Sequence, residues 1–337
     1  MWKTSLQILL TLSTLSFTLA QLENQTTTPF FTPQNTLFGN SIEGTSVDEL
    51  GNIFATNFLN ETFAIGQIFP EQKEFFLSNN ESSSFNGIRF LKLTKEEKIN
   101  IKSVFLAADK KRSEVTKVTF FQNNSAEQIT FCKDASFIEP NDLAISYNSG
   151  RIYISGQNFT NITQKGDGGL WLCEPDGQAK QLLSLGRTNG IELSPDEKVL
   201  YLSEAFNQNF IPISNKIWKF SVDVNNGQVS NQELFIDFAQ LDSSQFADID
   251  GMRCDVEGNL WVARNGDSKV LKFSADKKLL LELNTEQIIK TANLEFGGKN
   301  GSTLFIVGKC KDDNSKGCVD VFENSVPGRA FSVLTRA

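Results

Sequence analysis

The chain has 337 residues, of which 39% are hydrophobic and 21% charged, and it contains no histidine. This balance suits a folded globular protein. The missing histidine excludes Ser-His-Asp and Cys-His nucleophiles as well as histidine-ligated zinc. Asp and Glu number 40 against 32 Lys and Arg, a formal charge of −8, so we expect no nucleic-acid partner. Any catalysis must use carboxylates, amides, Lys, Tyr or a metal bound by oxygen atoms.

The first twenty residues are typical of a secretory signal peptide. Lys3 provides a positive start, residues 6–19 are mostly apolar, and Thr18-Leu19-Ala20 places small residues around a cleavage site. An N-terminal membrane anchor is the alternative, but the apolar run is short for a span of about 20 residues. We therefore expect residues 1–20 to be removed and the protein to be secreted. No later stretch predicts a membrane span.

The N-glycosylation sequons agree with export. Seven N-x-S/T sequons predict glycosylation at several positions, namely Asn24, Asn60, Asn80, Asn123, Asn158, Asn161 and Asn300.

Five cysteines are present, and export permits disulfides between them. Cys310 and Cys318 flank a polar segment typical of a hairpin loop, which predicts a disulfide between them. A pair between Cys132 and Cys173 is left open, and Cys254 is expected to be a small buried residue.

The body of the chain repeats short alternating strands separated by turn residues, which predicts an all-β protein. After an N-terminal linker at 21–36, residues 37–337 follow one template. A strand that opens with a polar residue is followed by a hairpin turn, a second strand, a loop and a third strand. The repeats begin at Glu43, Asn86, Asn141, Asn189, Asp250 and Asn293. A period of roughly 40–50 residues predicts blades of four strands, hence a single six-bladed β-propeller around a central channel. A β-sandwich is the alternative.

The opening residues of the six repeats predict a cation site. Because the innermost strand of each blade lines the channel, the six side chains are expected at one channel mouth. Every one carries a side-chain oxygen, and the carboxylates among them would repel one another unless a cation lay between them. Hard divalent cations such as Ca²⁺ prefer such oxygen ligands. The alternative is that Asn and Asp start these strands only as turn residues.

At these residues the chain resembles the senescence-marker-protein, gluconolactonase and luciferin-regenerating-enzyme family. The matching segments occur in the family's order and span roughly residues 40 to 310. They are Glu43-Gly44, Pro140-Asn141-Asp142, Asn189-Gly190 with Ser194-Pro195-Asp196, Asp250-Gly251-Met252, Gly258-Asn259-Leu260-Trp261-Val262-Ala263 and Phe296-Gly297-Gly298.

The resemblance implies a secreted lactonase, a carboxylic ester hydrolase that opens the ring of a sugar lactone. It implies a divalent cation held by Glu43, Asn189 and Asp250, with Asp250 as the candidate general base and Asn141 binding the substrate. The cation is expected to be Ca²⁺, although Zn²⁺, Mn²⁺ or Mg²⁺ would suit the same ligands. Asn86 and Asn293 are expected to line the channel without touching the cation.

One position departs from the family pattern, and several charged residues near the strand ends have no clear role in it. Many members carry an Arg two residues before the substrate-binding Asn, whereas Glu139 and Pro140 precede Asn141 here. Glu204 is expected to make an ordinary hydrogen bond within its blade. Three arginines near the strand ends are expected to be solvated at the surface, namely Arg89, Arg187 and Arg264.

Two other functional classes are left open. The first is a non-catalytic propeller that binds a partner and holds a structural cation, because fold alone does not determine function. The second is a propeller enzyme of another chemistry, similar to strictosidine synthase. The sequence does not indicate the oligomeric state.

Overall fold

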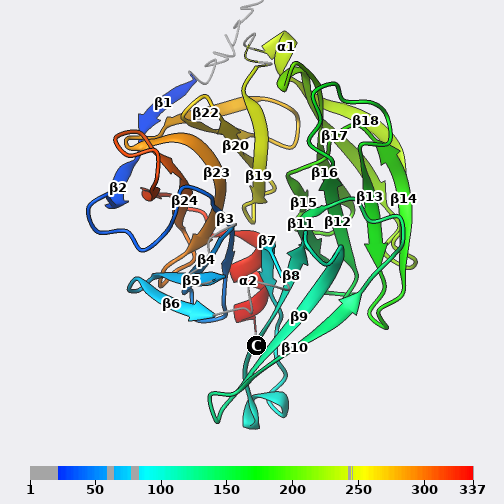
Figure 1. Ribbon diagram of the computed structural model, residues 1–337, viewed down its shortest axis with the longest axis vertical. Coiled ribbons are helices and arrows are strands. Elements are labelled where there is room, and N and C mark those ends of the chain that lie inside the picture. Colours follow the sequence, from blue (N-terminus) through cyan, green and yellow to red (C-terminus); the bar gives the residue numbers. More distant parts are fainter. Residues whose placement is uncertain (1–21, 59–63, 77–82, 242–243, 245, 337) are drawn as a thin grey trace, which may run out of the picture.

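The computed structural model describes residues 22–58, 64–76, 83–241, 244 and 246–336. The predicted signal peptide and the sequons at Asn60 and Asn80 lie outside these residues. Within them the chain is nearly all β, and its sheets stand around a central axis (Figure 1). No helix in the described part is long and apolar enough to cross a bilayer.

Four of the sheets are separate antiparallel blades of four strands each, and in every one of them the strands follow chain order from the channel outward. The first two blades contain β3 (Ile42–Val47), β4 (Ile53–Asn57), β5 (Ile65–Phe69), β6 (Lys73–Phe76), β7 (Phe85–Phe90), β8 (Ile101–Asp109), β9 (Glu114–Phe121) and β10 (Ala126–Cys132). The next two contain β11 (Pro140–Ile145), β12 (Ile152–Gln157), β13 (Gly168–Cys173), β14 (Ala179–Leu185), β15 (Ile191–Leu193), β16 (Val199–Gln208), β17 (Ile211–Val222) and β18 (Val229–Asp237).

The rest of the ring is one nine-stranded sheet. Its path runs β1-β22-β21-β20-β23-β24-β25-β2, and β19 pairs with β20 on the channel side. Its strands are β1 (Glu23–Thr26), β2 (Thr28–Phe31), β19 (Asp248–Cys254), β20 (Leu260–Asn265), β21 (Lys269–Phe273), β22 (Leu279–Asn284), β23 (Ile288–Gly297), β24 (Thr303–Cys310) and β25 (Gly317–Glu323). The helical elements are a 3₁₀ turn (Glu97–Ile99), α1 (Phe238–Leu241) and α2 (Arg329–Thr335).

The all-β propeller arrangement is therefore confirmed, but the predicted count of six blades is wrong: the described residues form four separate blades. The physical reason is a pairing between the last two repeats. The inner strand β23 begins early, at Ile288, and its Lys290 pairs with Asn265 at the end of β20. This contact merges the repeats that begin at Asp250 and Asn293 into a single sheet.

The N-terminal segment takes part in that sheet. Residues 21–36 were expected as a linker, but β1 pairs in parallel with β22 and β2 pairs antiparallel with β25. Between the two strands, the buried Thr27 donates its hydroxyl hydrogen to Asp320 at 2.7 Å. The segment thus covers both outer edges of the nine-stranded sheet.

Buried ion pairs fill the channel between the inner strands. Arg253 of β19 lies 2.8 Å from Glu295 of β23, and Arg89 of β7 lies 3.0 Å from Asp142 of β11. Asp142 also lies 3.6 Å from Arg253, which donates a hydrogen bond to the carbonyl oxygen of Thr45 in β3. The network thus links three of the four separate blades to the nine-stranded sheet, and its charges are paired, as buried charges must be. We call this set the channel network.

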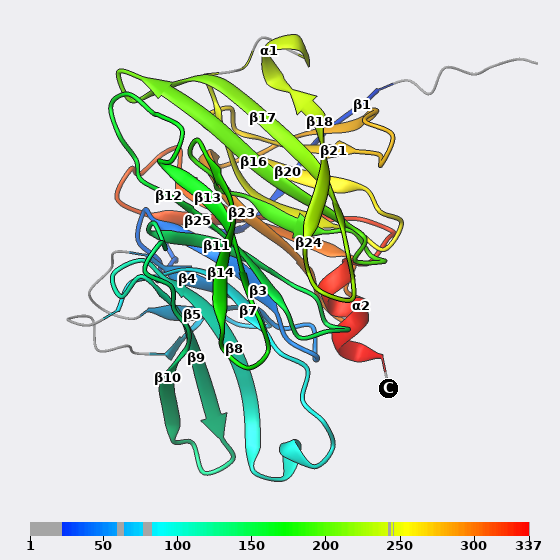
Figure 2. The ribbon, with the colours of Figure 1, turned by 90° about the vertical axis from the view of Figure 1, so that its right-hand side faces the viewer.

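Helix α2 covers one end of the channel. Its Arg329 lies 3.1 Å from Glu192 and 3.0 Å from Glu197, and it donates to the carbonyl oxygen of Ile145 at the end of β11. Figure 1 places α2 beside the inner strands near the middle of the ring, and Figure 2 shows it at the side of the molecule. The opposite end of the channel, where the inner strands begin, is not covered by α2.

The three arginines that were expected in solvent are instead buried, with exposed fractions of 3% for Arg89, 2% for Arg187 and 0% for Arg264. Each has a fixed acceptor. Arg89 belongs to the channel network, Arg187 pairs with Asp248 at 2.6 Å, and Arg264 donates to the carbonyl oxygen of Ser244 at 2.6 Å. The expectation failed because a charge near a strand end can be solvated by protein groups as well as by water.

Two disulfides are present. The predicted pair, Cys310–Cys318, joins β24 to β25, and the pair left open, Cys132–Cys173, joins β10 to β13 in the next blade. Cys254 is buried and free, as expected.

The disulfide between blades should contribute more stability than the one within a hairpin. Cys132–Cys173 closes a loop of 41 residues and Cys310–Cys318 a loop of 8. Replacing the first pair with alanines is expected to lower the free energy of unfolding by about 2–4 kcal/mol, because the unfolded chain regains more freedom. Denaturant titration of both double variants checks this, and an equal or larger loss from the Cys310/Cys318 pair would contradict it.

Candidate functional site

A pocket of about 490 Å³ lies where the inner strands begin. Its size is typical of sites for small molecules. The opening residues of five repeats line it, namely Glu43, Asn86, Asn141, Asn189 and Asp250. The structure therefore brings five of the six opening residues together at one pocket, as expected, with one exception. Asn293 is buried beside the pocket, where its side-chain oxygen accepts hydrogen bonds from Thr45 and from the backbone of Leu294.

A bulge in the inner strand places several of these side chains. In β7, β11 and β19 two inner-strand residues face a single residue of the partner strand, at 86–87, 141–142 and 250–251. The same irregularity in β3 falls at 44–45, one residue after Glu43. A bulge bends a strand and redirects its side chains. Here it occurs where each strand reaches the pocket, so the polar residues are directed toward the channel mouth.

The glycine that follows several of the polar residues is required by close packing around the channel. A Cβ atom on Gly190 would lie 2.1 Å from the carbonyl oxygen of Asp250, and one on Gly44 would lie 1.9 Å from that of Asn86. In both cases the obstructing atom belongs to the polar opening residue of the next repeat. The polar-residue–glycine motif thus brings neighbouring inner strands close enough for their polar side chains to meet.

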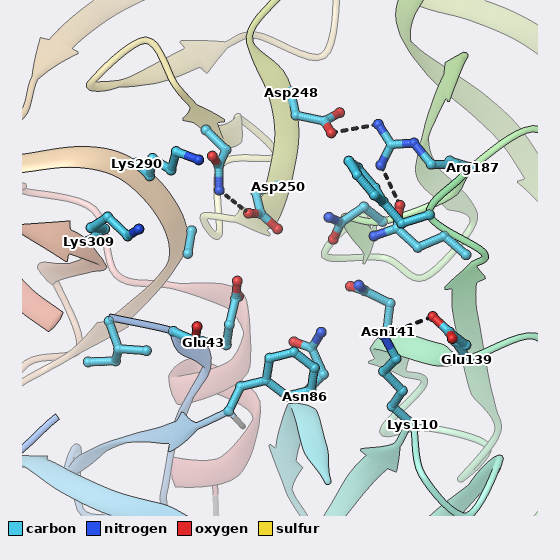
Figure 3. A pocket seen from close by; sticks show the side chains of 18 of the residues that line it. Glu43, Asn86, Lys110, Glu139, Asn141, Arg187, Asp248, Asp250, Lys290 and Lys309 are labelled. Atoms are coloured by element: carbon cyan, nitrogen blue, oxygen red, sulfur yellow. Dashed lines mark hydrogen bonds and ion pairs between the residues drawn. The ribbon is translucent and has the colours of Figure 1, made fainter. Parts of the chain in front are cut away.

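Glu43 and Asp250 are the two carboxylates of the pocket floor. Figure 3 shows both directed into the same space. Burial and the charge of Asp250 raise the pKa of Glu43 well above its usual value. Burial raises the pKa of Asp250 to about 7, against the opposing effect of a hydrogen bond from Asn265 Nδ2 at 2.8 Å. The fold therefore holds two carboxylates together although they repel each other.

The two amides predicted for the site join these carboxylates. The side chain of Asn189 is hydrogen-bonded to Asp250. Asn141 lies across the pocket from Glu43 and points toward it (Figure 3). Glu204 makes the expected hydrogen bonds within its blade, accepting from the backbone of Gly186 at 2.8 Å and from Trp218 Nε1 at 2.7 Å.

An ion pair between an arginine and an aspartate forms one wall of the pocket. The sequence did not predict this pair. Arg187 and Asp248 both line the pocket, and their ion pair is drawn in Figure 3. Each stands two residues before a predicted ligand, Asn189 or Asp250. Because side chains two apart on a strand share a face, this spacing on β19 could have revealed Asp248. Asn265 could not have been found in this way, since it reaches Asp250 only through the pairing of β19 with β20.

Lysines line other parts of the pocket. Lys290 and Lys309 are paired neighbours on β23 and β24, and Figure 3 shows both directed toward the pocket. Lys110 instead forms an ion pair with Glu139 at 2.9 Å. The position two residues before Asn141 thus carries a carboxylate that is paired with a lysine from the neighbouring blade.

The pocket floor fits a hard divalent cation. Its donors are all oxygen, from the carboxylates of Glu43 and Asp250 and the amides of Asn189 and Asn141, which is the set that Ca²⁺ prefers. A cation would also favour the charged forms of both carboxylates, whose pKa values are raised by burial and by neighbouring acidic groups. In the described part of the chain no three carboxylate or cysteine side chains gather in a metal-binding cluster. Amide oxygens and water would therefore have to complete the ligand set.

Comparison with known proteins identifies the family. A family profile described as the SMP-30/Gluconolactonase/LRE-like region matches residues 64–309. The chain belongs to this family. Gluconolactonase of Zymomonas mobilis is 32% identical over 184 residues, which cover 52% of this chain and 49% of that protein. Human regucalcin is 25% identical over 170 residues, covering 48% of this chain and 53% of that protein. The chain thus spans about half the length of these curated relatives.

Solved structures share the fold. A calcium-binding protein, regucalcin, from Agrobacterium tumefaciens matches 92% of this chain and 97% of its own with a TM-score of 0.69 and 18% identity. A gluconolactonase from Xanthomonas campestris matches 90% of this chain and 87% of its own with a TM-score of 0.60 and 17% identity. At these identities the likeness concerns the fold alone.

Substitution of Gly190 tests the close packing that assembles the pocket floor. Gly190→Ala is expected to lower the free energy of unfolding by about 1–3 kcal/mol, because the new methyl group would overlap the backbone of Asp250. Gly266→Ala is the control, since nothing lies within 4 Å of its Cβ position and only its positive φ of 97° opposes the change. Chemical denaturation compares the two, and a Gly190 variant as stable as the parent protein would contradict the role assigned to this glycine.

Proposed function

We propose that the protein is a lactonase, a hydrolase that opens the ring of a lactone in the pocket described above. The observation that carries the proposal is the meeting of two carboxylates, the half-buried Glu43 and the buried Asp250, with Asn141 and Asn189 in the pocket of a gluconolactonase-family chain. The similarity to a gluconolactonase supports the same reaction class.

Asp250 is proposed as the general base. It lies in the pocket, and Asn265 holds its Oδ2 atom, which leaves the other carboxylate oxygen directed toward the pocket. A carboxylate fixed in this way can accept the proton of a water molecule as the water oxygen bonds to the lactone carbonyl carbon. When the bond between that carbon and the ring oxygen breaks, the proton is passed to the ring oxygen. The product is the open hydroxy acid.

Other residues of the pocket bind and orient. Asn141 lies across the pocket from Glu43, and we propose that it hydrogen-bonds the lactone from that side. Glu43, Asn189 and Asp250 would hold the divalent cation, with Ca²⁺ preferred and Zn²⁺, Mn²⁺ or Mg²⁺ compatible with the same oxygen ligands. A cation bound there would polarise the lactone carbonyl and stabilise negative charge on its oxygen.

We also propose that the mature protein is secreted. Its two disulfides suit an oxidising compartment. The asparagines of all five sequons in the described residues are exposed, so glycans can be accommodated there. Cleavage before Gln21 and modification of these asparagines can be read by mass spectrometry of the protein exported from its host cell.

Replacement of the proposed base should abolish turnover without unfolding the protein. Asp250→Asn is expected to lower kcat by roughly 10²–10⁴-fold, which is the usual contribution of a positioned base. Proton release from a panel of lactones measures the rate, and Asp276→Asn, at an exposed turn of the same sheet, is the matched control. Full activity of a folded Asp250→Asn protein would exclude this role.

Calcium should stabilise the protein by binding to Glu43 and Asp250. Neutralising Glu43 should therefore raise the stability of the cation-free protein but reduce the stability that the cation adds. In chelator, Glu43→Gln is expected to raise the melting temperature, because it removes the repulsion with Asp250. With Ca²⁺ the parent protein should gain about 2.7 kcal/mol at a concentration of 100 times Kd, and the variant much less. Thermal unfolding in both buffers measures this.

Exposed Glu127→Gln serves as the control for that experiment. An equal response of Glu43→Gln and the parent protein to Ca²⁺ would show that the cation binds elsewhere. Bound cation without turnover of any lactone would instead favour the non-catalytic propeller with a structural cation.

A further inference from the structure

The rim of the pocket differs in chemistry from its floor. Three exposed phenylalanines line it, with exposed fractions of 52% for Phe159, 55% for Phe210 and 62% for Phe246. Phe159 follows β12, Phe210 lies between β16 and β17, and Phe246 precedes β19. Single exposed apolar side chains are normal on protein surfaces. Three aromatic rings that converge on one pocket form a patch, and such patches mark binding sites. We call these three residues the aromatic rim.

Part of the rim is held in place before any ligand arrives. The rings of Phe159 and Phe210 are stacked, with centroids 6.1 Å apart and planes inclined by 19°. The Arg187 guanidinium lies 4.8 Å from the centroid of the Phe159 ring. Arg187 in turn is fixed by Asp248 at 2.6 Å and by Asn207 at 3.0 Å. A ligand would therefore meet ordered rings, and little conformational entropy would be lost on binding.

Phe210 occupies an unfavourable backbone conformation. It forms, with Asn209, the two-residue loop of the β16–β17 hairpin, and both residues have positive φ, 54° and 62°. Such loops usually place Gly at the second position, because a side chain there is crowded. The ring of Phe210 gains little from burial, since more than half of it is exposed. A strained and exposed aromatic residue at a pocket rim indicates a contact with another molecule.

From these observations, and resting on the proposed function, we infer that the preferred lactones carry an aromatic substituent. The lactone ring would reach Glu43, Asn141 and Asp250 on the floor, and the substituent would lie against the aromatic rim. Flat apolar groups release water from such rings and stack on them. A sugar lactone would instead bring hydroxyl groups against phenylalanine faces, where losing water without a new hydrogen bond is unfavourable.

The test compares an aromatic lactone with a sugar lactone. We expect the parent protein to have a higher kcat/KM for dihydrocoumarin than for glucono-δ-lactone. Phe210→Gly removes the ring and relieves the backbone strain, so the variant should fold at least as stably as the parent. The ratio of the two kcat/KM values, dihydrocoumarin over gluconolactone, should fall on the order of 10-fold. Ile129→Ser, at an exposed apolar position on β10 and outside the pocket, should leave the ratio unchanged.

A binding measurement separates failure of this inference from failure of the proposed reaction. The probe is 3,4-dihydro-2-quinolinone, the unreactive lactam analogue of dihydrocoumarin, followed by isothermal titration calorimetry. Lactam binding that weakens in Phe210→Gly supports the aromatic rim even if no lactone is hydrolysed. Absence of lactam binding, equal binding by the parent and the variant, or a higher kcat/KM for gluconolactone would each overturn the inference, whether or not the protein is a lactonase.

Discussion

The buried ion pairs of the channel are the constraint on which the rest of the structure depends. Arg89, Asp142, Arg253 and Glu295 come from four different inner strands and are buried where they meet. Removing one partner of such a set leaves an unpaired buried charge, a loss of about 3–5 kcal/mol. These four inner strands are therefore held at a defined height and orientation relative to one another. The pocket floor lies directly on this arrangement and takes its precision from it.

The same network explains why the two carboxylates of the floor can stay together. Asp142 adds to the repulsion that raises the pKa of Glu43, yet its own charge is matched by Arg89 and Arg253. Glu43 and Asp250 have no such arginine partner among the described residues. The charges below the floor are thus compensated within the protein, and those on the floor are left to interact with a ligand. The paired charges below the floor thus support the pocket, whereas the carboxylates of the floor are the groups available for reaction.

The sequence predicted the inner strands and the floor well because both depend on local chemistry. A polar residue followed by glycine indicates the close approach of two backbones, and this pattern predicted that Glu43, Asn189 and Asp250 lie at the channel mouth and indicated the family. What it could not predict depends on pairing between distant residues. The fusion of the last two repeats rests on the Asn265–Lys290 contact. The aromatic rim combines two loops and a hairpin tip that share no sequence pattern.

The covering of the nine-stranded sheet by β1 and β2 has a consequence for how the protein is made. Thr27 and Asp320 are 293 residues apart in the chain, yet they share a buried hydrogen bond. During synthesis the first strands to leave the ribosome must wait for the last ones before they can pair. Until then both sheet edges and their intended partners are unpaired and open to association with other chains. The edges of the nine-stranded sheet are therefore covered only after β22 and β25 have been made.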